Sequence, residues 1–152
     1  MGTTIVAATV IGNTLYAANV GDSRLYVINQ EDITQITRDH SLVEEMVSMG
    51  EINREQARNH EKKNIITRAV GVADEVKIDI FERQLDPGED IVLCSDGLTN
   101  MVEDEVILRI LHGTCSLSDK AEQLIELANK NGGKDNITVI IIEPNLDEVT
   151  EC

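Results

Sequence analysis

Apolar residues in the first 28 positions follow the pattern of β-strands. Residues 3–11, 14–20 and 24–28 are rich in β-branched and small apolar residues, and glycine-containing pairs at 12–13 and 21–22 separate them. Gly-Asn and Gly-Asp pairs between apolar runs are typical of tight turns. Because tight turns join neighbouring antiparallel strands, this region predicts a three-stranded antiparallel meander.

Helical periodicity replaces this pattern after residue 40. Across residues 41–50 the apolar side chains recur three and four positions apart, Ser41 is suited to cap the helix, and Gly50 is suited to end it. A second short helix is predicted from Asn53, because Asn53 and Gln56 have the spacing of a capping box. The polar residues that follow predict a surface excursion.

The second half of the chain combines strands with amphipathic helices. Residues 76–85 alternate, and the Pro-Gly pair at 87–88 predicts a turn into an apolar strand that ends at Asp96, as in a hairpin. Two helices and a last strand are predicted at 103–112, 117–130 and 136–143. The order of the elements predicts one α+β domain at residues 1–145 with largely antiparallel sheets, followed by an acidic tail at 146–152.

Composition narrows the range of partners. The chain has 13 basic and 28 acidic residues, a net charge of −15, which disfavours nucleic acids and anionic membranes and favours cations. Its three cysteines are widely spaced and form no Cys-x-x-Cys pair, which indicates a reducing, cytoplasmic setting. No apolar stretch has the length of a membrane span, and the first residues lack the basic region of a signal peptide.

Three aspartates lie where predicted strands begin or end. Asp22 follows the second strand, Asp96 ends an apolar run, and Asp135 precedes the last strand. Antiparallel pairing of the strands beside Asp96 and Asp135 would bring both carboxylates to one sheet edge, where Asp22 could join them. Gathered carboxylates favour a hard divalent cation such as Mg²⁺ or Mn²⁺. Each motif alone is more typical of an ordinary turn, so only their combination predicts a metal site.

Two neighbours of these aspartates are predicted to support the site. Gly97 allows the backbone to turn sharply after Asp96 without a Cβ clash, and Asn136 offers a hydrogen bond that would hold the loop of Asp135. The histidines are weaker candidates for chemistry. His40 directly precedes a helix cap, so a structural role is predicted for it.

Six segments together resemble a known enzyme family. They are GTTIVAA, ANVGDSRLY, DHSLVEEMV, RNHEKKNIITRAVG, CSDGLTN and GGKDNITVI. Their order and spacing are similar to the C-terminal two-thirds of bacterial metal-dependent serine/threonine protein phosphatases of type 2C, the PPM family. The resemblance implies an αββα sandwich with a binuclear Mn²⁺ or Mg²⁺ centre in a cleft at one edge of the sheets. It also implies hydrolysis of phosphoserine and phosphothreonine through a metal-activated water, with proteins phosphorylated by a serine/threonine kinase as substrates.

The resemblance assigns roles to individual positions. Asp96 and Asp135 match ligands of the second catalytic metal, and Asp22 matches an acid that, with Asp96, binds a third metal in bacterial members. The segment at about 41–64 matches the flap beside the cleft, which influences substrate access. Within it the candidate substrate-access residues are Arg58, His60 and Asn64.

The sequence departs from the family at its N-terminal side. Two family elements are absent: R-x-x-N-E-D, with a phosphate-binding arginine and a metal-ligand acid, and D-G-x-G-G-H, whose aspartate bridges both metals. The domain is therefore predicted to be N-terminally truncated, with a weak or partial metal site and no activity alone. A homodimer through the exposed edge is also predicted. The alternative function is a non-catalytic, degenerate phosphatase module that binds a protein partner or a weakly held divalent cation.

Overall fold

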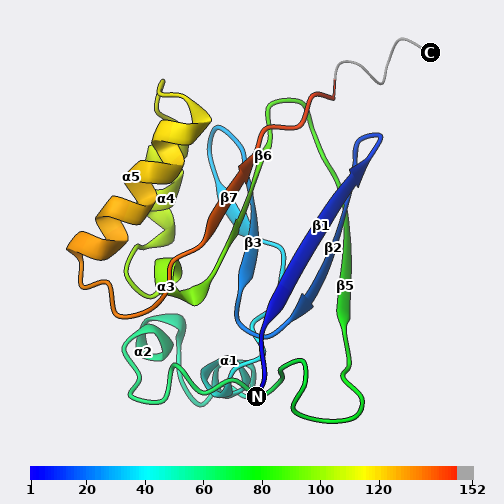
Figure 1. The fold of residues 1–152 in the computed structure, drawn as a ribbon, viewed down its shortest axis with the longest axis vertical. Helices are drawn as coiled ribbons and strands as arrows, with labels where there is room; N and C mark the ends of the chain where they lie inside the picture. The colour runs from blue at the N-terminus through cyan, green and yellow to red at the C-terminus, as the bar shows by residue number, and fades with distance from the viewer. Residues whose placement is uncertain (147–152) are drawn as a thin grey trace.

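Two antiparallel β-sheets packed face to face form the centre of the molecule (Figure 1). The computed structural model describes residues 1–146, so residues 147–152 of the predicted acidic tail lie outside the described residues. One sheet has the strand order β1-β2-β5, and the other has the order β4-β3-β6-β7. The strands of the first sheet are Ile5–Ile11 (β1), Thr14–Val20 (β2) and Asp79–Gln84 (β5). Those of the second sheet are Arg24–Ile28 (β3), Ile33–Gln35 (β4), Asp90–Cys94 (β6) and Val139–Ile142 (β7).

Strands β3 and β6 are buried on both faces. One face of each strand joins β2 in the core between the sheets, which includes Leu15, Ala17, Leu25, Val27, Ile91 and Leu93. The opposite face contributes to a second core beneath the helices, with Tyr26, Ile28, Val92 and Cys94. Burial on both faces explains why these two strands are continuous apolar runs in the sequence. Burial also raises the pKa of the Cys94 thiol to about 12, so Cys94 behaves as a small apolar core residue.

Two helices cover the outer face of the four-stranded sheet. They are α4 (Asp104–Leu111) and α5 (Leu117–Lys130), close to the positions that the periodicity predicts, and their apolar sides complete the second core. A one-turn helix, α3 (Asp96–Thr99), follows β6 and is not predicted by the sequence pattern. None of the helices in residues 1–146 combines the length and the apolar character that crossing a membrane requires.

The segment at residues 41–64, which we call the flap, forms a lobe at one end of the sheets (Figure 1). Helix α1 (Leu42–Ser48) begins after Ser41, whose side chain accepts a hydrogen bond from a backbone N–H of the first turn. Helix α2 (Arg54–Arg58) begins after Asn53 with a complete capping box. Both caps are confirmed, so short-range capping determines where the flap helices begin.

The connections between the two sheets contradict two predictions. Residues 24–28 do not complete a meander, because β3 pairs with β6 in the other sheet. Strands β5 and β6 do not form a hairpin either, because β5 pairs with β2. The chain crosses between the sheets after Gly21, which has a φ of 114° and packs so closely on Thr4 that no Cβ would fit. A glycine turn thus signals a change of direction without specifying whether the next strand stays in the same sheet.

The outer face of the three-stranded sheet carries no helical layer from residues 1–146 (Figure 1). Three isoleucines on this face, Ile5, Ile11 and Ile80, are 52%, 65% and 67% exposed. The α+β class with antiparallel sheets is as predicted, and within the described residues α4 and α5 cover one sheet only. The three-stranded sheet therefore presents an apolar surface to solvent.

His40 joins distant segments of the fold. Its Nδ1 accepts a hydrogen bond from the Gly21 N–H at 2.9 Å, and its Nε2 lies 2.7 Å from the Asp79 carboxylate. Because Nδ1 is an acceptor, the ring proton is on Nε2 and is donated to Asp79. The residue is 6% exposed. His40 therefore ties the turn between β2 and β3 to the start of β5, which is a structural role.

Replacing His40 with alanine is expected to lower the free energy of unfolding by about 2–3 kcal/mol, because the buried Gly21 N–H loses its acceptor and the Asp79 carboxylate loses one of its two partners. The matched control is His60→Ala, at a half-buried flap position where the ring accepts one hydrogen bond, from the Lys62 N–H, and it is expected to change the free energy by about 1 kcal/mol or less. Urea unfolding monitored by circular dichroism measures both. Equal effects of the two substitutions would contradict the structural role of His40.

Candidate metal centre

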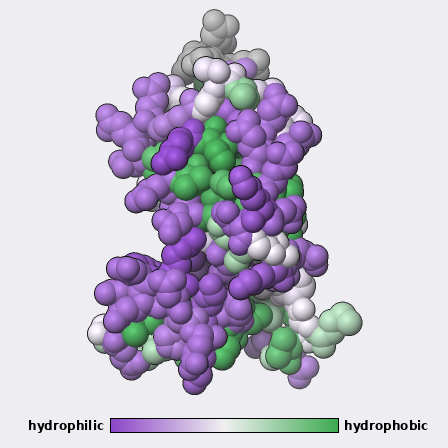
Figure 2. Space-filling view, turned by 90° about the vertical axis from the view of Figure 1, so that its left-hand side faces the viewer, coloured by the Kyte–Doolittle hydropathy of each residue, from purple (hydrophilic) through white to green (hydrophobic). Residues whose placement is uncertain are grey.

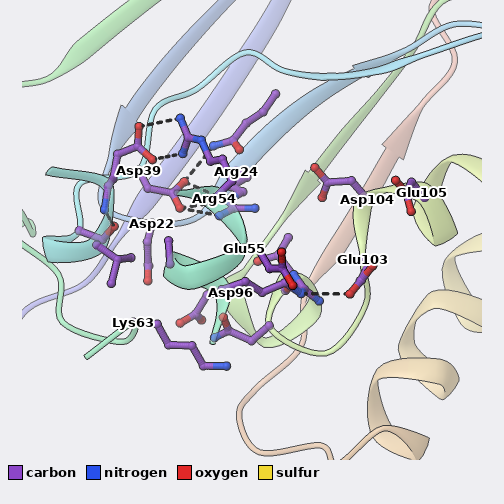
Figure 3. Close-up of a pocket in the computed structure, with 18 residues that line it drawn as sticks. Asp22, Arg24, Asp39, Arg54, Glu55, Lys63, Asp96, Glu103, Asp104 and Glu105 are labelled. Atoms are coloured by element: carbon purple, nitrogen blue, oxygen red, sulfur yellow. Dashed lines mark hydrogen bonds and ion pairs between the residues drawn. The ribbon is translucent and has the colours of Figure 1, made fainter. Parts of the chain in front are cut away.

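The pairing of β3 with β6 brings two of the three predicted aspartates together. The two strands are antiparallel, with Arg24 opposite Cys94. Asp22 lies two residues before Arg24, and Asp96 lies two residues after Cys94. Both aspartates therefore emerge at the same end of the strand pair, and both line one cavity (Figure 3).

The electrostatics of this pair favour a bound cation. Burial, followed by the charges of Asp96 and Asp39, raises the pKa of Asp22 to about 7. Burial also raises the pKa of Asp96, and the charge of Asp135 adds to the effect. Ionised carboxylates this close repel each other, so near neutral pH the pair retains a proton unless a cation replaces it. The donors are carboxylate oxygens, which fit Mg²⁺ or Mn²⁺.

Asp135 lies on a neighbouring loop and not within the pair. Strand β7 pairs with β6, so the loop before β7 returns to the edge where Asp96 lies. The Asp135 carboxylate accepts a hydrogen bond from the Asn136 N–H at 2.7 Å. Within residues 1–146, no three His, Cys, Asp or Glu side chains converge into a ready metal-binding group. The structure therefore brings Asp22 and Asp96 together and places Asp135 close enough to act on Asp96 through its charge.

Gly97 and Asn136 hold two loops together in a way that differs from the prediction. Gly97 lies in α3 without a positive φ, and a Cβ there would collide with the carbonyl oxygen of Asn136. Close packing of two backbones, and not a sharp turn, therefore requires this glycine. The same carbonyl accepts a hydrogen bond from Ser95 Oγ at 3.2 Å, and Ser95 Oγ accepts one from the Thr138 N–H at 3.0 Å. Ser95, which the sequence analysis did not single out, thus fastens the loop of Asp135 to α3.

Two of the three predicted flap residues contact the site, and the third does not. Arg58 donates from Nη1 to the Thr99 carbonyl at 2.9 Å, which satisfies a free carbonyl at the end of α3. Asn64 Oδ1 accepts a hydrogen bond from Asn100 Nδ2 at 3.2 Å. His60 is half-buried and does not line the cavity. The flap is therefore attached to the same short helix that begins with Asp96.

A cavity of about 740 Å³ separates the flap from α3 and α4 (Figure 3). Within residues 1–146 its walls include eight carboxylate side chains: Asp22, Asp39, Glu44, Glu55, Asp96, Glu103, Asp104 and Glu105. Four cationic side chains also line it: Arg24, Arg54, Arg58 and Lys63. Figure 2 shows this side of the molecule, where the outline narrows between the flap and the remainder and the surface of the lower lobe is largely hydrophilic. The cavity is suited to a polar, charged ligand.

Two ion pairs in the cavity wall have acidic partners that the sequence analysis does not identify. Arg24 pairs with Asp39, with its Nη2 2.7 Å from Oδ2, and donates to the Tyr26 hydroxyl at 2.9 Å. Glu44 is 8% exposed and pairs with Arg54. Strand alternation places Arg24 and Tyr26 on one face of β3. No local pattern identifies the acidic partners, because they come from the segment after β4 and from α1.

Comparison with known proteins agrees with this geometry. Residues 1–137 match the family model described as Protein phosphatase 2C. The chain is 48% identical over 146 residues to the serine/threonine phosphatase stp of Listeria welshimeri serovar 6b, a match that covers 96% of this chain and 58% of that relative. The chain thus spans less than two thirds of the length of this relative.

Two solved structures share the fold. The serine/threonine phosphatase Stp1 from Staphylococcus aureus matches with a TM-score of 0.90 and 45% identity, over 93% of this chain and 56% of that chain. The catalytic domain of the serine/threonine protein phosphatase PstP, in complex with two manganese ions, matches with a TM-score of 0.82 and 39% identity, over 93% of this chain and 58% of that chain. With agreement in sequence and in backbone over nearly all of its residues, the chain belongs to the protein phosphatase 2C family.

Proposed function

We propose that the chain forms part of a metal-dependent phosphatase that hydrolyses phosphoserine and phosphothreonine in proteins. The observation that carries the proposal is the convergence of Asp22 and Asp96 at a polar cavity in a member of this family. Asp22, Asp96 and Asp135 would hold Mn²⁺ or Mg²⁺. When bound, such a cation supplies Lewis acidity and lowers the pKa of a water molecule. The substrate segment would lie in the cavity, with Arg58 and Asn64 fixing the flap beside it.

The wider setting of this function is also a proposal. The substrates would be proteins phosphorylated by a serine/threonine kinase, and the setting would be the cytoplasm, as the spacing of the cysteines indicates. The net charge of −15 disfavours nucleic acids and anionic membranes as partners. Phosphorylated proteins are compatible with this charge if a divalent cation neutralises the carboxylates at the site.

A second candidate is a non-catalytic module that binds a partner or a weakly held cation. Two observations favour it for the chain as it stands. The R-x-x-N-E-D and D-G-x-G-G-H elements are absent from the sequence, and within residues 1–146 no three metal-ligating side chains converge. A cation held by few carboxylates keeps most of its waters and is bound weakly.

The acidity of Asp22 provides a test of cation binding. A carboxyl group whose pKa is higher in the folded than in the unfolded protein binds more protons when folded, so its contribution to stability falls as pH rises from about 4 to about 7. At pH 8 without divalent cations, Asp22→Asn is therefore expected to be more stable than the wild type by about 1–2 kcal/mol, after allowance for solvent screening. In millimolar Mn²⁺ the order is expected to reverse, because the wild type alone gains the binding energy of the cation.

Thermal unfolding at pH 8, with EDTA and with Mn²⁺, measures both halves of this prediction. The matched control is Asp32→Asn, at an exposed position that does not line the cavity, which is expected to behave as the wild type in both buffers. If Asp22→Asn is more stable than the wild type in Mn²⁺ as well as in EDTA, Asp22 does not bind the cation.

The two candidate functions differ in activity. The isolated chain is expected to show negligible Mn²⁺-dependent hydrolysis of a phosphothreonine peptide, because the family elements for metal bridging and phosphate binding are absent. Adding the portion of a relative such as Listeria stp that lies outside the match is expected to restore turnover, and Asp96→Ala or Asp135→Asn is expected to abolish it again. Phosphate release measures each step. Failure of the complemented protein to turn over would favour the non-catalytic module.

We also propose that two copies of the chain associate through the three-stranded sheet. Its outer face is apolar, and β1 and β5 are edge strands. Three strands of about seven residues form a face of roughly 14 by 23 Å, or about 320 Å² on each copy, so two copies bury roughly 650 Å² in total. This area is below the roughly 1,000 Å² of stable specific interfaces, so the association is weak and the dimer is expected to dissociate on dilution.

Sedimentation velocity over a concentration series tests this association. Raising the salt concentration is expected to strengthen the dimer, because it screens the repulsion between two chains of charge −15. Ile80→Lys is expected to abolish it, whereas Ile140→Lys, at a 52% exposed position on the other sheet, is the matched control and is expected to leave it intact. A monomer at all concentrations in the wild type would exclude the proposed interface.

A further inference from the structure

Lys63 differs from the other cationic side chains of the cavity. Within residues 1–146, each arginine in the wall has an acidic partner: Arg24 with Asp39, Arg54 with Glu44 and Arg58 with Glu103. The Lys63 ammonium makes neither a hydrogen bond nor an ion pair with the described residues, although it lines the same cavity as Asp22 and Asp96 (Figure 3). Among the four cationic side chains of the wall, Lys63 is therefore the one whose charge no described acidic residue neutralises.

The position of Lys63 is nevertheless fixed. Its backbone N–H donates to the His60 carbonyl at 3.2 Å, within the turn that follows α2. The next residue, Asn64, accepts a hydrogen bond from Asn100 at the end of α3, and α3 begins with Asp96. Lys63 is half-buried. Its backbone therefore keeps a defined place relative to Asp96, while its ammonium group remains available to a ligand.

The charges around Lys63 indicate what that ligand is. If Asp22 and Asp96 hold a divalent cation, their negative charge is compensated, and a second positive charge on the same wall has no protein partner. Two positive charges that line one cavity attract a ligand with at least two negative charges and several acceptor oxygens. A phosphoryl group has these properties. A lysine ammonium is a compact donor that binds phosphate without requiring one fixed planar geometry.

We propose that Lys63 binds an oxygen of the phosphoryl group on the substrate residue, opposite the cation held by Asp22 and Asp96. This inference rests on the proposed phosphatase function and adds a substrate-binding residue to it. Lys63 contributes affinity for the phosphorylated residue, and it takes no part in proton transfer. The preference of the cavity for phosphorylated over unphosphorylated protein segments then depends on this side chain.

The test measures binding by the whole chain in the presence of Mg²⁺, by NMR titration, which detects weak complexes. The ligands are a phosphothreonine peptide, the same peptide without phosphate, and inorganic phosphate. Lys63→Met is expected to weaken binding of the phosphopeptide and of inorganic phosphate about tenfold, which is the size typical of a hydrogen bond to a charged group. Lys63→Arg is expected to restore most of the affinity, because it keeps the positive charge.

Lys62→Met is the matched control, because Lys62 is the adjacent lysine, is exposed and does not line the cavity. It is expected to change each affinity less than about twofold. If Lys63→Met binds the phosphopeptide as tightly as the wild type does, the role of Lys63 is wrong and the proposed function stands. If Lys63→Met loses the same factor in affinity for the phosphorylated and the unphosphorylated peptide, the proposed role is also wrong, because Lys63 would then contact another part of the peptide. If the wild type itself does not distinguish the two peptides, both proposals fail.

Discussion

The antiparallel pairing of β3 with β6 is the constraint on which the rest of the structure depends. Each strand is buried on both faces, so its register is specified twice, by the core between the sheets and by the core beneath α4 and α5. A shift of one residue would turn Tyr26 and Val92 from the helix side to the sheet side. The same register places Asp22 and Asp96 at one end of the pair. Burial of apolar surface thus holds together two like charges that would otherwise separate.

The distribution of neutralised and free charge separates structural acids from candidate ligands. Within the described residues, Asp39 and Glu44 have arginine partners in the cavity wall, and Asp79 has both His40 and Arg68. Among residues 1–146, Asp22 and Asp96 have no such partner, and burial raises the pKa of each. An excess of acids across the whole chain would not distinguish these two. Other acids of the cavity also have no ion pair among residues 1–146, so it is burial combined with the lack of a cationic partner that makes Asp22 and Asp96 suited to an external cation.

Local sequence signals predicted the elements, and non-local packing decided how they connect. Capping residues such as Ser41 and Asn53 act within one turn, so the starts of the flap helices could be predicted. The assignment of β3 to the second sheet could not, because the turn at Gly21 looks the same in either case. The role of Gly97 depends on the carbonyl of Asn136, which is 39 residues away. Each aspartate motif alone is typical of a turn, so their combination at strand ends predicted the metal site, and the resemblance to the family supplied the roles of the individual residues and of the flap.

Helix α3 links the parts of the site that lie far apart in the sequence. Its first residue is Asp96, Gly97 packs against the loop of Asp135, and its last carbonyl accepts a hydrogen bond from Arg58 in the flap. A helix of one turn has little stability of its own, so these contacts from three segments determine its position. A substitution that removes one of these contacts is therefore expected to shift α3 relative to the other two segments. The width of the cavity and the separation of the carboxylates are for this reason two consequences of the same packing.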